Sequence, residues 1–138
     1  MKNTVLVDTS ALIALGNKAD NHHIQAKVIK RQLQQNNYNF VTSNAILLEF
    51  GNAFSPSHLR PIAVQTIKAI QESKQWTCVF IDLLIKEGLD LFEDRPDKDW
   101  GLVDCTSIVI AKERGISEIF TTDHHFEQAG FQILLPKD

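Results

Sequence analysis

Four acidic side chains stand where the sequence is otherwise apolar. Asp8 directly follows the run TVLV, and Asp123 comes soon after the run EIF. Glu49 lies in ILLEF, and Asp104 lies in GLVDCTSIVI. An ionised carboxylate among apolar side chains is costly unless it is paired, bound to a metal ion or turned to solvent. Because carboxylate oxygens suit Mg²⁺ and Mn²⁺, we expect the four to form one catalytic, metal-binding cluster.

Such a cluster has a definite chemistry. Mg²⁺ binds oxygen ligands at about 2.1 Å and keeps several waters, so a few carboxylates are enough to hold it. Without a metal ion, mutual repulsion would raise some of the carboxyl pKa values. A bound ion relieves this repulsion, lowers the pKa of a bound water and stabilises negative charge on a phosphoryl oxygen. The acids therefore suit metal-assisted hydrolysis of a phosphate ester.

Each acid also has a purely structural explanation. Asp8 could cap a helix that starts near Ser10, and Asp123 could cap the turn DHHFEQ. Asp104 could satisfy backbone donors in the first turn of its helix, and Glu49 could lie on a solvated helix face. Four separate explanations are then needed, whereas a shared metal site accounts for all four acids at once.

The elements that must position these acids alternate between strands and helices. We expect strands at residues 4–7, 38–42, 77–81, 118–121 and 131–135. We expect helices at residues 10–15, 22–35, 45–54, 61–73, 83–93 and 102–114, with a short helical turn at 123–129. Asn44 and Asp82 are the expected caps of the third and fifth helices. This alternation predicts a parallel sheet with helices on both faces, whose ligands bind at the carboxyl ends of the strands.

Composition limits the possible classes of protein. The 138 residues are 43% apolar and 22% charged, which suits one globular domain over residues 1–138. We expect no membrane span, no signal peptide and a cytoplasmic location. Cys78 and Cys105 lie in apolar surroundings and are expected to be reduced, with a disulfide left open. The net charge of −3 argues against binding nucleic acid through a basic surface, but not against an acidic nuclease with bound cations.

Four segments together resemble the PIN domain family, in particular its VapC-type toxin ribonucleases. These segments are VDTSAL, ILLEFGNAF, DWGLVDCTSIVIA and IFTTDHHFEQAGF, in the family's order and spacing over almost the whole chain. The resemblance implies a three-layer α/β/α sandwich with a central, mostly parallel sheet of about five strands. It also implies a metal-dependent endoribonuclease that uses Mg²⁺ or Mn²⁺.

The resemblance carries the family's acidic residues onto the same four acids. It adds supporting polar residues, which are Thr9, Ser10, Asn52 and Thr121. Related sequences often have serine at the position of Gly101, so a hydroxyl is missing ahead of Asp104. Asp99, five residues before Asp104, is expected to be a loop residue.

The resemblance further implies an RNA substrate, a small antitoxin partner and a homodimer. In the expected reaction, three aspartates hold one or two ions, and Glu49 accepts a proton from the attacking water. One rival is a phosphatase of the haloacid dehalogenase type, which needs a second acid two residues after its nucleophile, where this chain has Ser10. The other rival is an inactive PIN-like module that binds RNA or protein, and the complete acidic set disfavours it.

Two neighbouring histidines suggest zinc at first sight. Adjacent side chains do not easily share one face, and no cysteine or further histidine stands at zinc spacing from His124 and His125. We expect a local hydrogen bond or plain exposure for both. Trp76 and Trp100 are expected to pack in the core or at its edge.

Overall fold

A fully parallel sheet lies at the centre of the fold. The computed structural model describes residues 3–136, and its five strands have the order β3-β2-β1-β4-β5. The strands are β1 (Thr4–Val7), β2 (Asn39–Ser43), β3 (Trp76–Val79), β4 (Glu118–Phe120) and β5 (Gln132–Ile133). Each strand overlaps a predicted strand, so the predicted parallel sheet of about five strands is confirmed.

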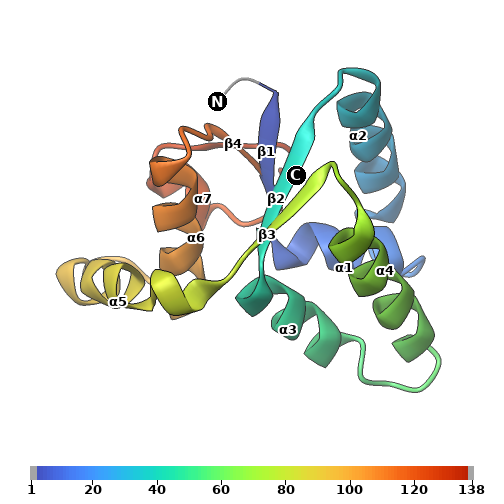
Figure 1. Ribbon diagram of the computed structural model, residues 1–138, viewed down its shortest axis with the longest axis horizontal. Coiled ribbons are helices and arrows are strands. Elements are labelled where there is room, and N and C mark those ends of the chain that lie inside the picture. Colours follow the sequence, from blue (N-terminus) through green and yellow to red (C-terminus); the bar gives the residue numbers. More distant parts are fainter. Residues whose placement is uncertain (1–2, 137–138) are drawn as a thin grey trace.

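Helices cover both faces of this sheet. They are α1 (Thr9–Gly16), α2 (His23–Gln35), α3 (Asn44–Ala53), α4 (Arg60–Glu72), α5 (Ile85–Asp94), α6 (Leu102–Glu113) and α7 (His125–Gln128), with a 3₁₀ turn at Ile81–Leu83. Figure 1 shows α1, α2 and α4 on one side of the sheet and α6 and α7 on the other. Right-handed crossovers require this, because the chain moves from β1 to β3 in one direction and from β3 to β5 in the other. The predicted α/β/α sandwich is therefore confirmed.

The central strands are apolar because both of their faces are covered. All four residues of β1 are buried, as expected for a parallel strand between two helical layers. Val5 and Leu6 of β1 pack with Ile119 of β4, Ile46 of α3 and Ile108 of α6 in one continuous core. This core fixes where β1 and β4 end, and the ends of these two strands carry the acids of interest.

The register of β1 and β4 aligns the segments that follow them. Val7 pairs with Phe120, and the backbone N–H of Asp8 donates to the Phe120 carbonyl at 3.1 Å. The chain leaves β1 toward α1 and leaves β4 toward α7, and these helices lie on opposite faces. A crevice at such a reversal is the usual place for a ligand in an open α/β sheet.

Two predicted helix caps are wrong. Ser43, not Asn44, caps α3, and its Oγ accepts the Ile46 N–H at 3.2 Å. Asn44 Oδ1 instead accepts the N–H of Ile81, 37 residues away, and so ties α3 to the end of β3. Asp82 lies inside the 3₁₀ turn and makes no cap for α5, because the chain needs that turn before α5 can begin.

Helix α5 packs on α6 through a glycine. Gly88 is the buried residue of α5, and a Cβ atom built there would lie 2.6 Å from Cγ2 of Thr106 on α6. The absence of a side chain therefore lets the two helices approach closely. Helix α6 carries Asp104, so this contact supports one of the four acids.

Other predictions about single residues can also be checked. Cys78 and Cys105 are both free thiols. Trp100 is buried and donates from Nε1 to Gln128 Oε1 at 3.1 Å, and Trp76 stacks on Phe40. The predicted packing roles of both tryptophans are confirmed. Among the residues that the structure describes, no helix has the length and apolar character needed to cross a bilayer.

Candidate active site

The four acids line one open hollow at the carboxyl ends of β1 and β4. Its volume is about 490 Å³, and we call it the acidic hollow. Its lining residues are Asp8, Thr9, Ser10, Ile13, Glu49, Asp104, Thr122, Asp123, His124 and His125. The structure thus brings together acids from four separate segments of the chain. No lysine or arginine is among these lining residues.

A second hollow, of about 550 Å³, lies between α1, α2 and α4. Lys18, Lys27 and Lys30 contribute to its lining, and no aspartate or glutamate does. The volumes of the two hollows are similar, so their lining chemistry distinguishes them. Only the acidic hollow has the carboxylates that metal-assisted chemistry requires.

Asp8 is the most deeply buried of the four acids, with only 5% of its surface exposed. It occupies the N-cap position of α1, yet its side chain makes no capping hydrogen bond, so the purely structural explanation fails here. Burial raises the pKa of Asp8 to about 7, the hydrogen bond from Thr121 opposes this rise, and the charges of Asp104 and Asp123 add to it. No ion pair among the described residues involves Asp8.

A chain of hydroxyl groups holds Asp8 in place. Thr121 Oγ1 donates to Asp8 Oδ2 at 2.9 Å, and it accepts the Asp123 backbone N–H at 3.0 Å. Ser10 Oγ lies 2.9 Å from Thr121 Oγ1 and accepts the Thr122 N–H at 3.0 Å. Because the single proton of Thr121 goes to Asp8, the Ser10 hydroxyl must donate to Thr121. This chain orients Asp8 and fixes the segment that carries Asp123.

Asp104 lies in the first turn of α6. Its Oδ2 accepts the backbone N–H of Gly101 at 3.1 Å, so the structural explanation is correct for this acid. Burial raises the pKa of Asp104, the Gly101 hydrogen bond opposes this, and the charge of Asp123 adds to the rise. A carboxylate has about four acceptor sites, so one such bond leaves capacity for a metal ion.

Asp123 also has a structural role. Its Oδ1 accepts the backbone N–H of His125 at 2.9 Å and so shapes the turn that starts α7. The backbone N–H of Asp123 is held in turn by Thr121. The carboxylate is therefore fixed in direction, and Asp123 lines the acidic hollow.

Glu49 reaches the acidic hollow from α3 and is exposed. Its Oε1 accepts the Thr9 hydroxyl at 2.7 Å, which ties it to the first turn of α1. The prediction that Glu49 lies on a solvated helix face is therefore correct, although the hydrogen bond from Thr9 restrains its side chain. Asn52, one turn further along α3, is exposed and does not line the acidic hollow, and neither does Asp99.

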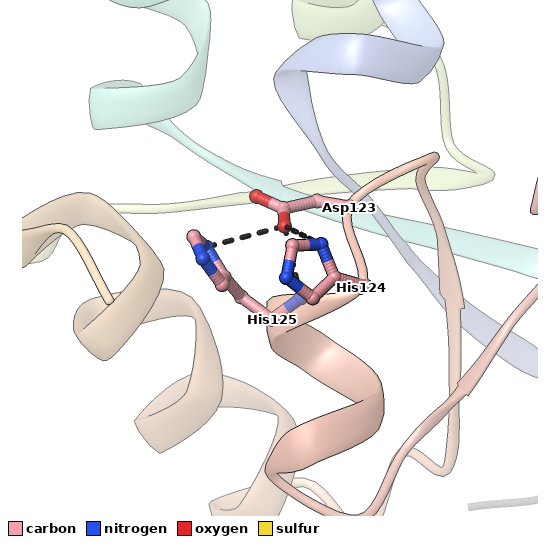
Figure 2. A group of neighbouring side chains, drawn as sticks. All are labelled: Asp123, His124 and His125. Atoms are coloured by element: carbon pink, nitrogen blue, oxygen red, sulfur yellow. Dashed lines mark hydrogen bonds and ion pairs between the residues drawn. The ribbon is translucent and has the colours of Figure 1, made fainter. Parts of the chain in front are cut away.

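His125 is a lining residue whose position beside two of the acids the sequence did not predict. Its side chain is 22% exposed, and Nδ1 lies 3.2 Å from Asp123 Oδ1 and 3.5 Å from Asp104 Oδ2. His124 is 69% exposed, and its Nδ1 lies 4.0 Å from Asp123 Oδ1. Figure 2 shows both rings turned toward Asp123. The useful signal was the spacing of Asp123 and His125, because an aspartate that starts a turn faces the residue two positions later.

The donor set fits a hard divalent cation. Three of the four acids are buried or half-buried, no cationic side chain lines the acidic hollow, and burial raises the pKa of both Asp8 and Asp104. Negative charges held together in this way are stabilised by a bound cation. The three aspartates are the residues that would hold such an ion, and Glu49 completes the acidic cluster.

Comparison with known proteins agrees with the fold. A model of the PIN domain family matches residues 5–132. The structure of Mycobacterium tuberculosis VapC20, described as a sarcin-ricin loop cleaving toxin, is similar with a TM-score of 0.81 and 25% sequence identity. The alignment covers 92% of this chain and 95% of that chain. None of the curated proteins matches the sequence. Because the family match runs from β1 to β5, the chain belongs to the PIN domain family.

Proposed function

We propose that the protein is a metal-dependent endoribonuclease that hydrolyses RNA phosphodiester bonds, and that it is the toxin of a type II toxin-antitoxin pair. The observation that carries this proposal is the convergence of four acids on one hollow, with Asp8 buried and its pKa raised. Membership of the PIN domain family and the likeness to an RNA-cleaving toxin support the same function.

In this proposal, Asp8, Asp104 and Asp123 hold one or two Mg²⁺ or Mn²⁺ ions. An ion held there would lower the pKa of a bound water and would stabilise negative charge on a phosphoryl oxygen. Thr121 keeps Asp8 in the orientation to bind through its hydrogen bond to Oδ2. Binding favours the ionised form of Asp8, which burial alone disfavours.

Glu49 is the proposed acceptor of the proton from the attacking water. Its exposed carboxylate can pass a proton to solvent, and the Thr9 hydroxyl holds it at the acidic hollow. Ser10 and Thr121 act through Asp8 and the segment of Asp123, so they are positioning residues. Asn52 has no part in this scheme, since it does not line the acidic hollow.

The two rival functions have less support. A phosphatase with Asp8 as nucleophile needs an acid at position 10, and the Ser10 hydroxyl there is engaged with Thr121 and Thr122. An inactive binding module has no need for four acids at one site. An antitoxin partner, a homodimer and a cytoplasmic location are part of the proposal as expected for VapC-type toxins.

The test is sequencing of RNA ends after brief expression of the wild type, Asp8→Asn and Asp99→Asn. We expect new RNA ends with the wild type and with Asp99→Asn, because Asp99 is an acid outside the acidic hollow. Asp8→Asn should reduce cleavage by at least about a hundredfold, since it removes an ion ligand worth several kcal/mol. The purified wild type should stop cleaving RNA in EDTA. Equal cleavage by wild type and Asp8→Asn would rule out this mechanism.

A further inference from the structure

We propose that His125 is a ligand of the divalent ion through Nδ1, and that this nitrogen makes the acidic hollow favour Mn²⁺ over Mg²⁺. The inference rests on the proposed function, because it concerns the ion of the same site. It adds an imidazole to a set of ligands that is otherwise made of carboxylates.

The first observation is the position of Nδ1 between two acids, one in α6 and one in the turn before α7. Nδ1 of His125 lies 3.2 Å from Oδ1 of Asp123 and 3.5 Å from Oδ2 of Asp104. Ligand atoms at about 2.1 Å from one octahedral ion lie roughly 3 Å apart when they are neighbours. The two distances are therefore those of atoms that share an ion, after a small movement of Asp104.

The second observation is that Nδ1 of His125 is buried and makes no well-aligned hydrogen bond, although it is within ion-pair distance of two carboxylates. Two carboxylate oxygens lie close enough, yet the nitrogen points at neither of them in hydrogen-bond geometry. Buried polar atoms without a partner are rare and costly in folded proteins. Atoms that bind a common ion point at the ion rather than at one another, which accounts for this arrangement.

The backbone of the turn before α7 holds the His125 ring close to the carboxylates that would share the ion with it. Asp123 Oδ1 accepts the His125 N–H at 2.9 Å, so the carboxylate and the imidazole belong to the same turn. Asp104 is held by Gly101 at the start of α6. The three donor atoms therefore come from backbone segments that are already in place. A preformed set of this kind loses little entropy when it binds an ion.

His124 does not fit the same role. Its side chain is 69% exposed, and its Nδ1 is 4.0 Å from the nearest Asp123 oxygen. No contact joins it to Asp104 among the ion pairs of the described residues. It is therefore a matched control, with the same side chain one position away.

The identity of the donor decides the preferred ion. Mg²⁺ takes oxygen ligands in a near-ideal octahedron, whereas imidazole nitrogen contributes more to the binding of transition metals. His125→Asn is an informative variant, because the asparagine Oδ1 is as many bonds from the backbone as Nδ1 and replaces nitrogen by oxygen. We expect it to lower Mn²⁺ affinity about tenfold relative to Mg²⁺ affinity, whereas His124→Ala leaves the ratio unchanged.

The decisive measurement is pulsed electron paramagnetic resonance of Mn²⁺ bound to the purified protein, prepared with ¹⁴N- or ¹⁵N-labelled histidine. We expect nitrogen modulation that changes with the histidine isotope, persists in His124→Ala and disappears in His125→Asn. Calorimetry with MnCl₂ and MgCl₂ on the same samples gives the affinity ratio. The wild type alone reports whether a histidine binds the ion, and the two variants then assign which histidine it is.

Three results would overturn the inference, and they differ in what they say about the proposed function. Bound Mn²⁺ without histidine modulation excludes Nδ1 of His125 as a ligand and leaves the ribonuclease proposal intact. Modulation that disappears in His124→Ala and persists in His125→Asn would show that His124 is the ligand. A wild-type protein that takes up neither ion removes both the inference and the metal-dependent function.

Discussion

Thr121 Oγ1 donates a hydrogen bond of 2.9 Å to Asp8 Oδ2 across 113 positions of the sequence. Thr121 is fully buried, and Asp8 nearly so. The same oxygen of Thr121 accepts the backbone N–H of Asp123, so one hydroxyl connects two of the four acids. The side chain is thus a fixed point between the ends of β1 and β4.

Thr121→Val should destabilise the protein. Valine has a similar volume but no hydroxyl, so Asp8, Ser10 and the N–H of Asp123 each lose a partner. Unpaired buried polar groups cost about 1–3 kcal/mol, and we expect a decrease of that size in the free energy of unfolding. Urea denaturation measures it. Thr121→Ser keeps the hydroxyl and should lose far less; equal losses in the two variants would show that the methyl group matters instead.

Stability without metal should fall as pH rises from about 4 to about 7. The pKa of Asp8 is raised from an ordinary value of 3.8 to about 7 in the folded protein. In this window the folded state binds more protons than the unfolded state, so the free energy of unfolding decreases with pH, by up to a few kcal/mol. The raised pKa of Asp104 acts in the same direction. Urea denaturation in EDTA, at several pH values, measures the slope.

Asp8→Asn should reduce this slope and stabilise the metal-free protein at pH 7.5, because an amide carries no charge to bury. Asparagine Oδ1 can still accept the Thr121 hydroxyl. Asp99→Asn is the control, since Asp99 is exposed and outside the acidic hollow. An Asp8→Asn variant as pH-dependent as the wild type would contradict the raised pKa of Asp8.

Mn²⁺ should stabilise the protein more at pH 7.5 than at pH 5. Protons compete with the ion for Asp8 and Asp104, whose pKa values are raised. At a free ion concentration of a hundred times Kd, the gain in unfolding free energy is about 2.7 kcal/mol. Thermal unfolding with MnCl₂ or with EDTA gives the difference in Tm. A shift of equal size in Asp8→Asn would place the ion elsewhere.

Glu49→Gln should separate activity from stability. The side chain is exposed, and a glutamine Oε1 can still accept the Thr9 hydroxyl, so unfolding should change by less than about 0.5 kcal/mol. Loss of the proton acceptor should slow RNA cleavage by roughly a hundredfold or more. Single-turnover cleavage of a labelled RNA gives the rate. Full activity would remove Glu49 from the proposed proton transfer.

The sequence predicted the parts of the site that depend on strand ends. Asp8 and Asp123 each follow an apolar strand, and in a parallel sheet these ends meet at one edge. Glu49 and Asp104 could be identified because a charge inside an apolar helix needs a reason. The PIN resemblance then carried the same four acids, but it also suggested Asn52, which the geometry of α3 leaves outside the acidic hollow.

What the sequence did not predict depends on contacts between distant segments. Asn44 has the chemistry of a cap, but the N–H of Ile81 competes for its side chain, and Ser43 takes the capping position. The position of His125 depends on the turn made by Asp123 and on where α6 places Asp104. Neither contact can be predicted from the secondary-structure propensities of the local sequence.

The order of the acids along the chain has a consequence for synthesis. Asp123 is the last of the four acids along the chain, and the sheet position of β4 beside β1 is needed to bring it to Asp8. A nascent or prematurely terminated chain that lacks β4 therefore carries no complete set of ligands. On the proposed function, a ribosome making this protein is exposed to its nuclease only after β4 and Asp123 have been translated.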